Sequence, residues 1–243
     1  MFTDTPFTKE NLNNCLKELA KEFRKLNGTA MPAEIILIGG ASVLANYGFR
    51  DMTYDIDAVI TASSVMKEAV NRVGDRLGLP NGWLNMDFKK TTSYSDKLSE
   101  VSVYYKTFSN ILTVRTVAAE YLIAMKLMSG RQYKYDLSDA TGILFEHQKK
   151  GSPISREAID KAVATLYGEG AELPPISQKT IDDAFESGDY ERAYTEIREK
   201  EKEAKEILLE FDKDYPGALK ADNIDSVIGN IRRKREQIKK ETK

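Results

Sequence analysis

The stretch from residue 35 to residue 60 constrains the fold of this 243-residue chain more than any other feature. An apolar run ends at two adjacent glycines, Gly39 and Gly40, and a second apolar run opens with two aspartates, Asp55 and Asp57. A short apolar run bounded by turn residues is typical of a buried strand. The stretch therefore predicts two strands joined by a short helix, with the glycines ending the first strand and the aspartates opening the second.

The glycine pair has one possible functional interpretation and one purely structural interpretation. Glycines between a strand and a helix let backbone N–H groups approach a phosphate closely. The N-terminus of the following helix adds the positive end of a dipole, and Ser42 adds a hydroxyl donor. The pattern lacks the third glycine of a dinucleotide-binding fingerprint and the Gly-Lys-Ser/Thr of a Walker loop. Taken alone, the glycines are explained more simply by a tight strand-to-helix turn.

The two aspartates favour the functional interpretation. Strand alternation places Ile56, Ala58 and Ile60 on one face and turns Asp55 and Asp57 onto the other. Two close carboxylates repel each other, so this arrangement is unfavourable unless a cation or strong donors neutralise them. Mg²⁺ prefers carboxylate and phosphate oxygens, and carboxylates that share magnesium ions can support in-line displacement at phosphorus. The alternative is a solvated strand face, although aspartate is a poor strand former.

The remaining segments complete a mixed fold. Apolar residues recur at helical spacing between Thr8, which can cap a helix, and Gly28, which can end it. A capped amphipathic helix is predicted over residues 63–79, and two strands joined by a turn near Ser109 and Asn110 follow. The pattern predicts an α/β fold of the α+β kind, with a small mixed sheet flanked by helices and a mostly helical C-terminal region.

Three parts of the chain are expected. They are an α/β core with its N-terminal helix over residues 1–115, a helical block packed on the core over 116–170, and a helical C-terminal extension over 171–243. The last boundary is placed in "EGAELPPISQ", because its glycines and its Pro174–Pro175 pair interrupt any helix.

Composition excludes several classes of site. The chain has 36 Lys and Arg against 38 Asp and Glu, and a net charge of −2 gives no overall attraction for nucleic acid or an acidic membrane. Cys15 is the only cysteine, which excludes an internal disulfide and a cysteine-rich zinc site. His147 is the only histidine, and nothing suggests that it pairs with Cys15 as a nucleophile. With no targeting segment and no apolar run near the roughly 20 residues of a membrane span, we expect a cytoplasmic protein without membrane contact.

Two blocks of the sequence resemble a known superfamily. "IGGAS", a short helix and "FRDMTYDID" resemble the signature of the nucleotidyltransferase fold. Arg50 and Thr53 ahead of the aspartates resemble the AbiEii-like bacterial branch, known from abortive-infection and toxin–antitoxin systems. "EYLIAMKLMSGRQYKYDLSDATGIL" is similar to the helical block of that branch, and "WLNMDF" is similar to a segment of a related bacterial group. The resemblance covers roughly residues 34–144.

The resemblance implies a nucleotidyltransferase fold that transfers a nucleoside monophosphate from an NTP to a hydroxyl acceptor. The acceptor would be an RNA 3′ end or a protein, Mg²⁺ would be the cofactor, and an antitoxin protein would be a partner. The implied nucleotide-binding residues are Gly39, Gly40, Ser42, Arg50, Thr53 and Lys126. The implied metal ligands are Asp55 and Asp57, with Lys126 facing the phosphates and Asp136 and Asp139 at the late acidic positions of the catalytic set.

Each late residue also has a purely structural interpretation. Lys126 could be a solvated helix residue, Arg131 could cap a helix C-terminus, and Asp136 with Asp139 could cap a helix N-terminus. Many nucleotidyltransferases carry a third carboxylate on a later strand.

Where that carboxylate would stand, the predicted strand offers Thr113 and Arg115 instead, although Asp87 could substitute. The general base is therefore not assigned. Three alternatives stay open. The protein is a weak transferase, a transferase that uses another base such as Asp136 or Asp139, or a nucleotide- or partner-binding module that does not catalyse.

The C-terminal end carries a basic cluster. It could contact RNA phosphates or an acidic antitoxin. A solvated helix end is the simpler interpretation, because no aromatic residues for base stacking are interleaved. The cluster consists of Arg232, Arg233, Lys234, Arg235, Lys239 and Lys240.

Overall fold

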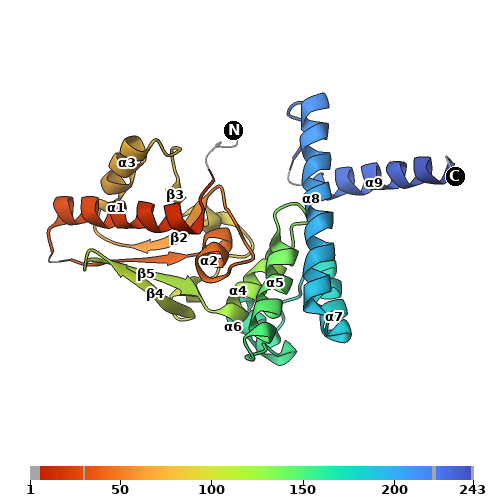
Figure 1. Ribbon diagram of the computed structural model, residues 1–243, viewed down its shortest axis with the longest axis horizontal. Helices are drawn as coiled ribbons and strands as arrows, with labels where there is room; N and C mark the ends of the chain where they lie inside the picture. Colours follow the sequence, from red (N-terminus) through yellow and green to blue (C-terminus); the bar gives the residue numbers. More distant parts are fainter. Residues whose placement is uncertain (1–5, 30, 221–222, 242–243) are drawn as a thin grey trace.

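The computed structural model describes residues 6–29, 31–220 and 223–241. Within these residues a mixed sheet lies beside a series of helices, with the N-terminal half of the chain around the sheet and the C-terminal helices to one side (Figure 1). The strands are β1 (Ala33–Leu37), β2 (Ile56–Thr61), β3 (Leu84–Asn85), β4 (Ser102–Phe108) and β5 (Leu112–Val117). The helices are α1 (Lys9–Asn27), α2 (Gly39–Asn46), α3 (Met66–Leu77), α4 (Ala119–Ser129), α5 (Asp136–Lys149), α6 (Arg156–Tyr167), α7 (Pro175–Ser187), α8 (Tyr190–Asp214) and α9 (Ile224–Glu241), with short 3₁₀ turns at Asp87–Lys90 and Asp96–Ser99.

The strand order brings the two sequence motifs together. The order is β3-β2-β1-β5-β4, with β1 antiparallel to β2 and parallel to β5. Leu37 at the end of β1 therefore pairs with Ala58 near the start of β2, and the Ile38 N–H donates to the carbonyl of Asp57 at 3.0 Å. The glycine pair and the aspartates meet at one end of the sheet, and the predicted α+β fold is confirmed.

Most local predictions agree with the structure. Thr8 caps α1 in a capping box with Asn11, and α1 ends before Gly28. Ser109 and Asn110 both have positive φ, as a tight two-residue hairpin turn requires. The predicted side-chain cap of α3 is wrong. The helix starts after Val65, which has no polar side chain for a cap, and the nearby hydroxyl of Ser63 donates to Asn27 Oδ1 at 2.6 Å.

Two apolar cores cover the two faces of the sheet. One core packs α1 and α3 against side chains such as Ile35 and Ile56. The other packs α4 to α7 against side chains such as Ile36 and Ile38. The helical block therefore packs on the sheet face that carries Ile36 and Ile38. This packing places α4 and α5 beside Asp57.

The C-terminal helices pack on the helical block. Helix α8 crosses α5, and α9 extends away from it (Figure 1). Arg232 and Arg235 of the basic cluster pair with Glu203 and Glu210 of α8 at 3.4 and 2.8 Å, so intramolecular contacts account for part of this cluster. The side chains of Lys239 and Lys240 lie outside the described residues. No helix in the described ranges combines the length and the apolar composition needed to traverse a bilayer.

Candidate active site

The first glycine of the pair lies against the second aspartate. Helix α2 starts at Gly39, whose φ of +53° favours glycine. A Cβ at this position would lie 3.9 Å from Asp57 Oδ2. The turn therefore presents backbone to a carboxylate that projects from the neighbouring strand.

The second glycine has a different role. A Cβ on Gly40 would lie 2.7 Å from both Arg50 Nη2 and Thr53 Oγ1, so these two side chains cover it. Thr53 is buried, and its hydroxyl donates to Asp55 Oδ1 at 3.3 Å. Gly40 thus lets the loop before β2 pack on the start of α2, which fixes the approach to Asp55. Ser42 is fully buried, and its hydroxyl has no hydrogen-bond partner in the described part of the chain.

The two aspartates fit a magnesium ion. Burial, followed by the negative charge of Asp55, raises the pKa of Asp57 to about 6. A carboxylate that is poorly solvated and repelled by its neighbour is stabilised by a cation. Among the described residues no group of three His, Cys, Asp or Glu side chains could hold a metal ion. Mg²⁺ is usually held by one or two carboxylates together with substrate phosphates, so two aspartates suffice for that ion.

Lys126 is at the centre of a buried ion network, because it pairs with both Asp136 and Asp139. Its ammonium group donates to Asp136 Oδ1 at 2.9 Å and pairs with Asp139 Oδ2 at 2.8 Å. Arg131 Nε donates to Asp136 Oδ2 at 2.8 Å, and the Arg50 guanidinium pairs with the Asp139 carboxylate. The network therefore connects α4, α5, the loop between them and the loop before β2.

This network excludes the simpler interpretations of its members. Lys126 is 5% exposed, so it is not a solvated helix residue. Asp136 and Asp139 direct their carboxylates to cations, and α5 has no side-chain cap from its own N-cap residue, Tyr135. Arg131 pairs with Asp136 and does not only end a helix.

The charges of the network keep Asp136 ionised. Burial opposes the ionisation of Asp136, but the positive charges of Lys126 and Arg131 outweigh it and lower the pKa of Asp136 to about 2. Burial lowers the pKa of Lys126, but the negative charges of Asp136 and Asp139 outweigh it, so the pKa is raised. Asp136 is therefore ionised at neutral pH, but a carboxylate with such a low pKa is a weak general base.

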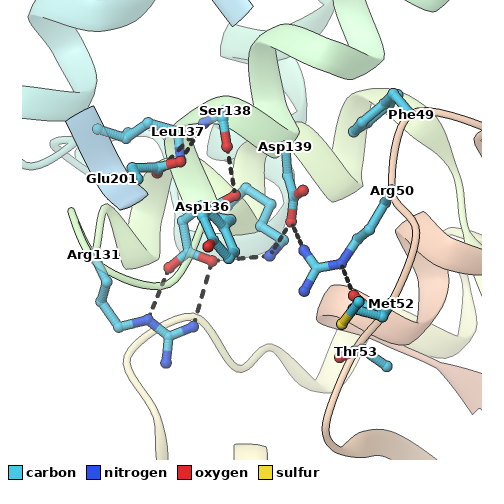
Figure 2. A network of polar contacts seen from close by, with 12 residues as sticks. Phe49, Arg50, Met52, Thr53, Arg131, Asp136, Leu137, Ser138, Asp139 and Glu201 are labelled. Carbon is cyan, nitrogen blue, oxygen red and sulfur yellow. Dashed lines mark hydrogen bonds and ion pairs between the residues drawn. The ribbon is translucent and has the colours of Figure 1, made fainter. Parts of the chain in front are cut away.

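Glu201 is a site residue that the sequence did not single out. It belongs to α8, yet its carboxylate accepts the Leu137 N–H at 2.9 Å and the Ser138 N–H at 3.4 Å (Figure 2). It therefore caps the N-terminus of α5 from another helix, at 2% exposure. Burial, and to a smaller extent the charges of Asp139 and Asp136, raise the pKa of Glu201 to about 8. The interleaved acidic and basic residues around it are typical of an exposed helix, and only the recurrence of Ala204, Ile207 and Leu208 signals a buried face.

Asp55 and Asp57 line two different cavities. Asp57 lines the smaller, of about 220 Å³, together with Gly39, Lys126, Arg131 and Asp136. Asp55 lines the larger, of about 610 Å³, together with Arg50 and Thr53. Gly40 and Ser42 line neither of these two cavities, so Gly39 is the glycine that faces open space.

The structure also places the candidates for a third carboxylate. Asp87 lines the smaller cavity, although its exposed carboxylate pairs with Lys90 at 3.1 Å. Arg115 on β5 donates to Ser102 Oγ at 2.7 Å, and neither Arg115 nor Thr113 lines either cavity. Strand β5 therefore supplies no acid to the site.

Comparison with known proteins gives one match. The model of the family described as "Nucleotidyltransferase of unknown function (DUF6036)" matches residues 14–145, which is more than half of the chain. No curated protein and no solved structure matches. The matched segment contains the glycine turn, Asp55 and Asp57, and ends within α5. It also contains all five members of the ion network, Arg50, Lys126, Arg131, Asp136 and Asp139.

Proposed function

The chain belongs to this family of nucleotidyltransferases, and from that premise we propose that it transfers a nucleoside monophosphate from an NTP to a hydroxyl group in a Mg²⁺-dependent reaction. In this reaction the acceptor oxygen forms a bond to the α-phosphorus, the bond to the β-phosphate oxygen breaks, and pyrophosphate leaves with the electron pair of that bond. The proton of the acceptor hydroxyl passes to a base.

One observation carries the proposal, namely the position of Asp57 between the Gly39 turn and the network of Lys126. The carboxylate faces a cavity that also contains a glycine backbone at a helix N-terminus and the cation Arg131. Backbone N–H groups at a helix start and cationic side chains are the groups that bind phosphate. Asp55 and Asp57 would hold Mg²⁺, which when bound neutralises the charge that develops on the transferring phosphate.

The ion network has a positioning role in this proposal. Lys126 holds Asp136 and Asp139 in place, while Asp139 holds Arg50 against Gly40 and the loop that leads to Asp55. Lys126 and Arg131 line the smaller cavity, from which they supply positive charge to a phosphate beside Asp57. Direct phosphate contact is proposed for Gly39, Lys126 and Arg131, whereas Gly40, Thr53 and Arg50 act by fixing the loop.

The acceptor and the biological role belong to the same proposal. The two sequence blocks that resemble the AbiEii-like branch favour an RNA 3′ end or a protein hydroxyl as acceptor. They also favour the toxin of a toxin–antitoxin or abortive-infection system, with an antitoxin as partner.

A second candidate is a nucleotide-binding or partner-binding module with weak or no catalysis. It is favoured by β5, which carries Thr113 and Arg115 where a third carboxylate is common in this superfamily. It is also favoured by the low pKa of Asp136, which makes this candidate base a weak one.

Label transfer distinguishes the two candidates. The purified full chain is incubated with each α-³²P-labelled NTP, Mg²⁺ and either total bacterial RNA or lysate protein. The test variant carries Asp55→Asn and Asp57→Asn, and the matched control carries Asp75→Asn and Asp96→Asn, which remove the same charge from exposed positions.

The transferase proposal predicts label on one class of macromolecule with the wild type and the control, and none with the test variant. Label that persists in the test variant would refute the assignment of the aspartates. Mg²⁺-dependent NTP binding in calorimetry without any label transfer would establish the binding module instead.

A further inference from the structure

The larger cavity has a wall that the family match does not contain. One side comes from the loop at residues 50–55 and from residues 80–83, next to Asp55, and another from residues 133–135. The remaining side comes from α8 and from the segment that leads to α9, beyond the matched residues 14–145. At about 610 Å³ the cavity is in the size range of small-molecule and nucleotide sites.

Three cations that line the larger cavity have no acidic partner, one from residues 133–135 and two from α8. Within the described residues Lys134, Arg198 and Lys205 form no ion pair, and Arg198 Nη1 is buried without a hydrogen-bond partner. The Arg198 guanidinium lies 3.6 Å from the centre of the Tyr135 ring, and the Lys205 ammonium lies 5.3 Å from that of Tyr54. These rings hold the cations in place without neutralising them.

The local field at Lys205 is positive. Burial, and then the charges of Lys134, Arg198 and Arg50, lower the pKa of Lys205. Asp51, Asp55 and Asp212 also line the cavity, but none of them pairs with the three cations, and Asp212 accepts the Gly217 N–H at 3.4 Å. A cavity wall on which three cations lack an ion-pair partner is electrostatically suited to an anion.

The rest of the lining is suited to a flat aromatic group. Tyr54, Tyr133, Tyr135 and Trp83 line the cavity together with aliphatic side chains, among them Leu208 and Leu209. Aromatic rings bind nucleobases by stacking without strong sequence preference. The cavity therefore offers cations for phosphate and rings for a base, beside a carboxylate of the proposed metal site.

We propose that Lys134, Arg198 and Lys205 form a phosphate-binding wall of the active-site cavity, and that the cavity takes a nucleotide unit. This inference rests on the proposed function in one respect, namely that Asp55 next to the cavity belongs to the metal site. The nucleotide unit is either the donor NTP or the terminal nucleotide of an acceptor strand, because both present a phosphate and a base. In both cases α8 contributes two binding residues, Arg198 and Lys205, that lie outside the nucleotidyltransferase family match.

Binding of two probes to the full chain tests the wall without requiring turnover. The first probe is a fluorescein-labelled 12-nucleotide single-stranded RNA with a free 3′ hydroxyl, measured by anisotropy in EDTA at low salt. The second is each unlabelled NTP, measured by calorimetry with Mg²⁺. The test variant is Arg198→Gln with Lys205→Gln, and the control is Arg192→Gln with Lys202→Gln, which removes the same charge from exposed positions of the same helix.

We expect the test variant to weaken at least one probe by tenfold or more, since each lost charged hydrogen bond is worth about tenfold or more in affinity. The control should change binding by less than about twofold. Loss of RNA binding alone identifies the acceptor strand as the occupant, and loss of NTP binding identifies the donor. Unchanged binding of both probes, or wild type that binds neither, overturns the proposal.

Two further measurements keep this outcome interpretable. Thermal unfolding followed by circular dichroism shows whether the double variant folds, and Lys205→Gln alone replaces it if loss of the Arg198 contact with Tyr135 unfolds the chain. Label transfer is scored separately. Probe binding that depends on α8 in a protein that transfers no label would support the wall and refute the transferase function. Label transfer that is unaffected in the α8 variant would support the transferase function and refute the wall.

Discussion

Replacing Glu201 by glutamine should make the stability of the protein less sensitive to alkaline pH. Glu201 is 2% exposed and caps α5 through the N–H groups of Leu137 and Ser138. Its pKa is raised from an ordinary value of 4.5 to about 8, mainly by burial. Glutamine keeps the shape and a carbonyl acceptor for the N–H groups, but it cannot ionise.

The sign of the effect follows from proton linkage. Because the folded state holds the proton of Glu201 more tightly than the unfolded state, its contribution to stability is fully present below pH 4.5. The contribution is lost as the pH rises through about 8. Each tenfold change in proton affinity is worth about 1.4 kcal/mol, so the loss is about 5 kcal/mol at most. Relaxation of α8 and water entry should reduce it to roughly 2–4 kcal/mol.

Urea unfolding followed by circular dichroism at pH 5, 7 and 9 measures this. The free energy of unfolding of Glu201→Gln minus that of wild type should be near zero at pH 5 and should increase by roughly 2–4 kcal/mol in favour of the variant by pH 9. Glu199→Gln, an exposed change on the same helix, should show no such trend. A difference that is flat with pH would refute a raised pKa for Glu201. A variant that becomes less stable than wild type at pH 9 would show that the anionic form of Glu201 is the one that stabilises α5.

Three other changes test the site. Gly40→Ala should lower the free energy of unfolding by about 1–3 kcal/mol in urea titration, because its Cβ would lie 2.7 Å from Arg50 Nη2; Gly170→Ala, which meets open space, should change it by less than about 0.5 kcal/mol. Lys126→Met should cost about 3–5 kcal/mol in the same assay, because it leaves two buried carboxylates without their shared cation, and a loss below 1 kcal/mol would contradict a buried network. Because the pKa of Asp57 is raised to about 6, Asp57→Asn should have a higher temperature of unfolding than wild type when both are measured above pH 6, and the difference should disappear below pH 4. An Asp57→Asn variant that is less stable than wild type at pH 8 would refute that reasoning.

Local signals predicted the features that depend on neighbours in the sequence. The cap at Thr8, the end at Gly28 and the turn at Ser109 and Asn110 all follow from backbone preferences of a few residues, and all are found. The meeting of the glycine turn with Asp57 was also predictable, because strand alternation and a short connection leave few arrangements. The failed cap of α3 shows the limit, since the hydroxyl of Ser63 found a partner 36 residues away.

Contacts between distant segments decided the remainder of the site. Whether Lys126 is solvated or buried depends on the packing of α4 against α5, which places two carboxylates within 2.9 Å of its ammonium group. Which residue caps α5 depends on α8, 64 positions further along the chain, as the bond from Leu137 to Glu201 shows. Periodicity identifies a helix and its faces, but it does not identify the helix against which a face packs.

The position of α8 makes the C-terminal extension a part of the candidate site. Its Glu201 caps the helix that carries Asp136 and Asp139, its Tyr194 hydroxyl donates to the Phe49 carbonyl at 3.2 Å, and its Arg198 and Lys205 line the cavity beside Asp55. A shift of α8 would therefore change the support of the ion network and the wall of the cavity at once. A folded protein truncated after residue 188 should still bind Mg²⁺ at the aspartates, because the sheet holds them. It should no longer bind the nucleotide unit, because α8 carries Arg198 and Lys205 of the wall.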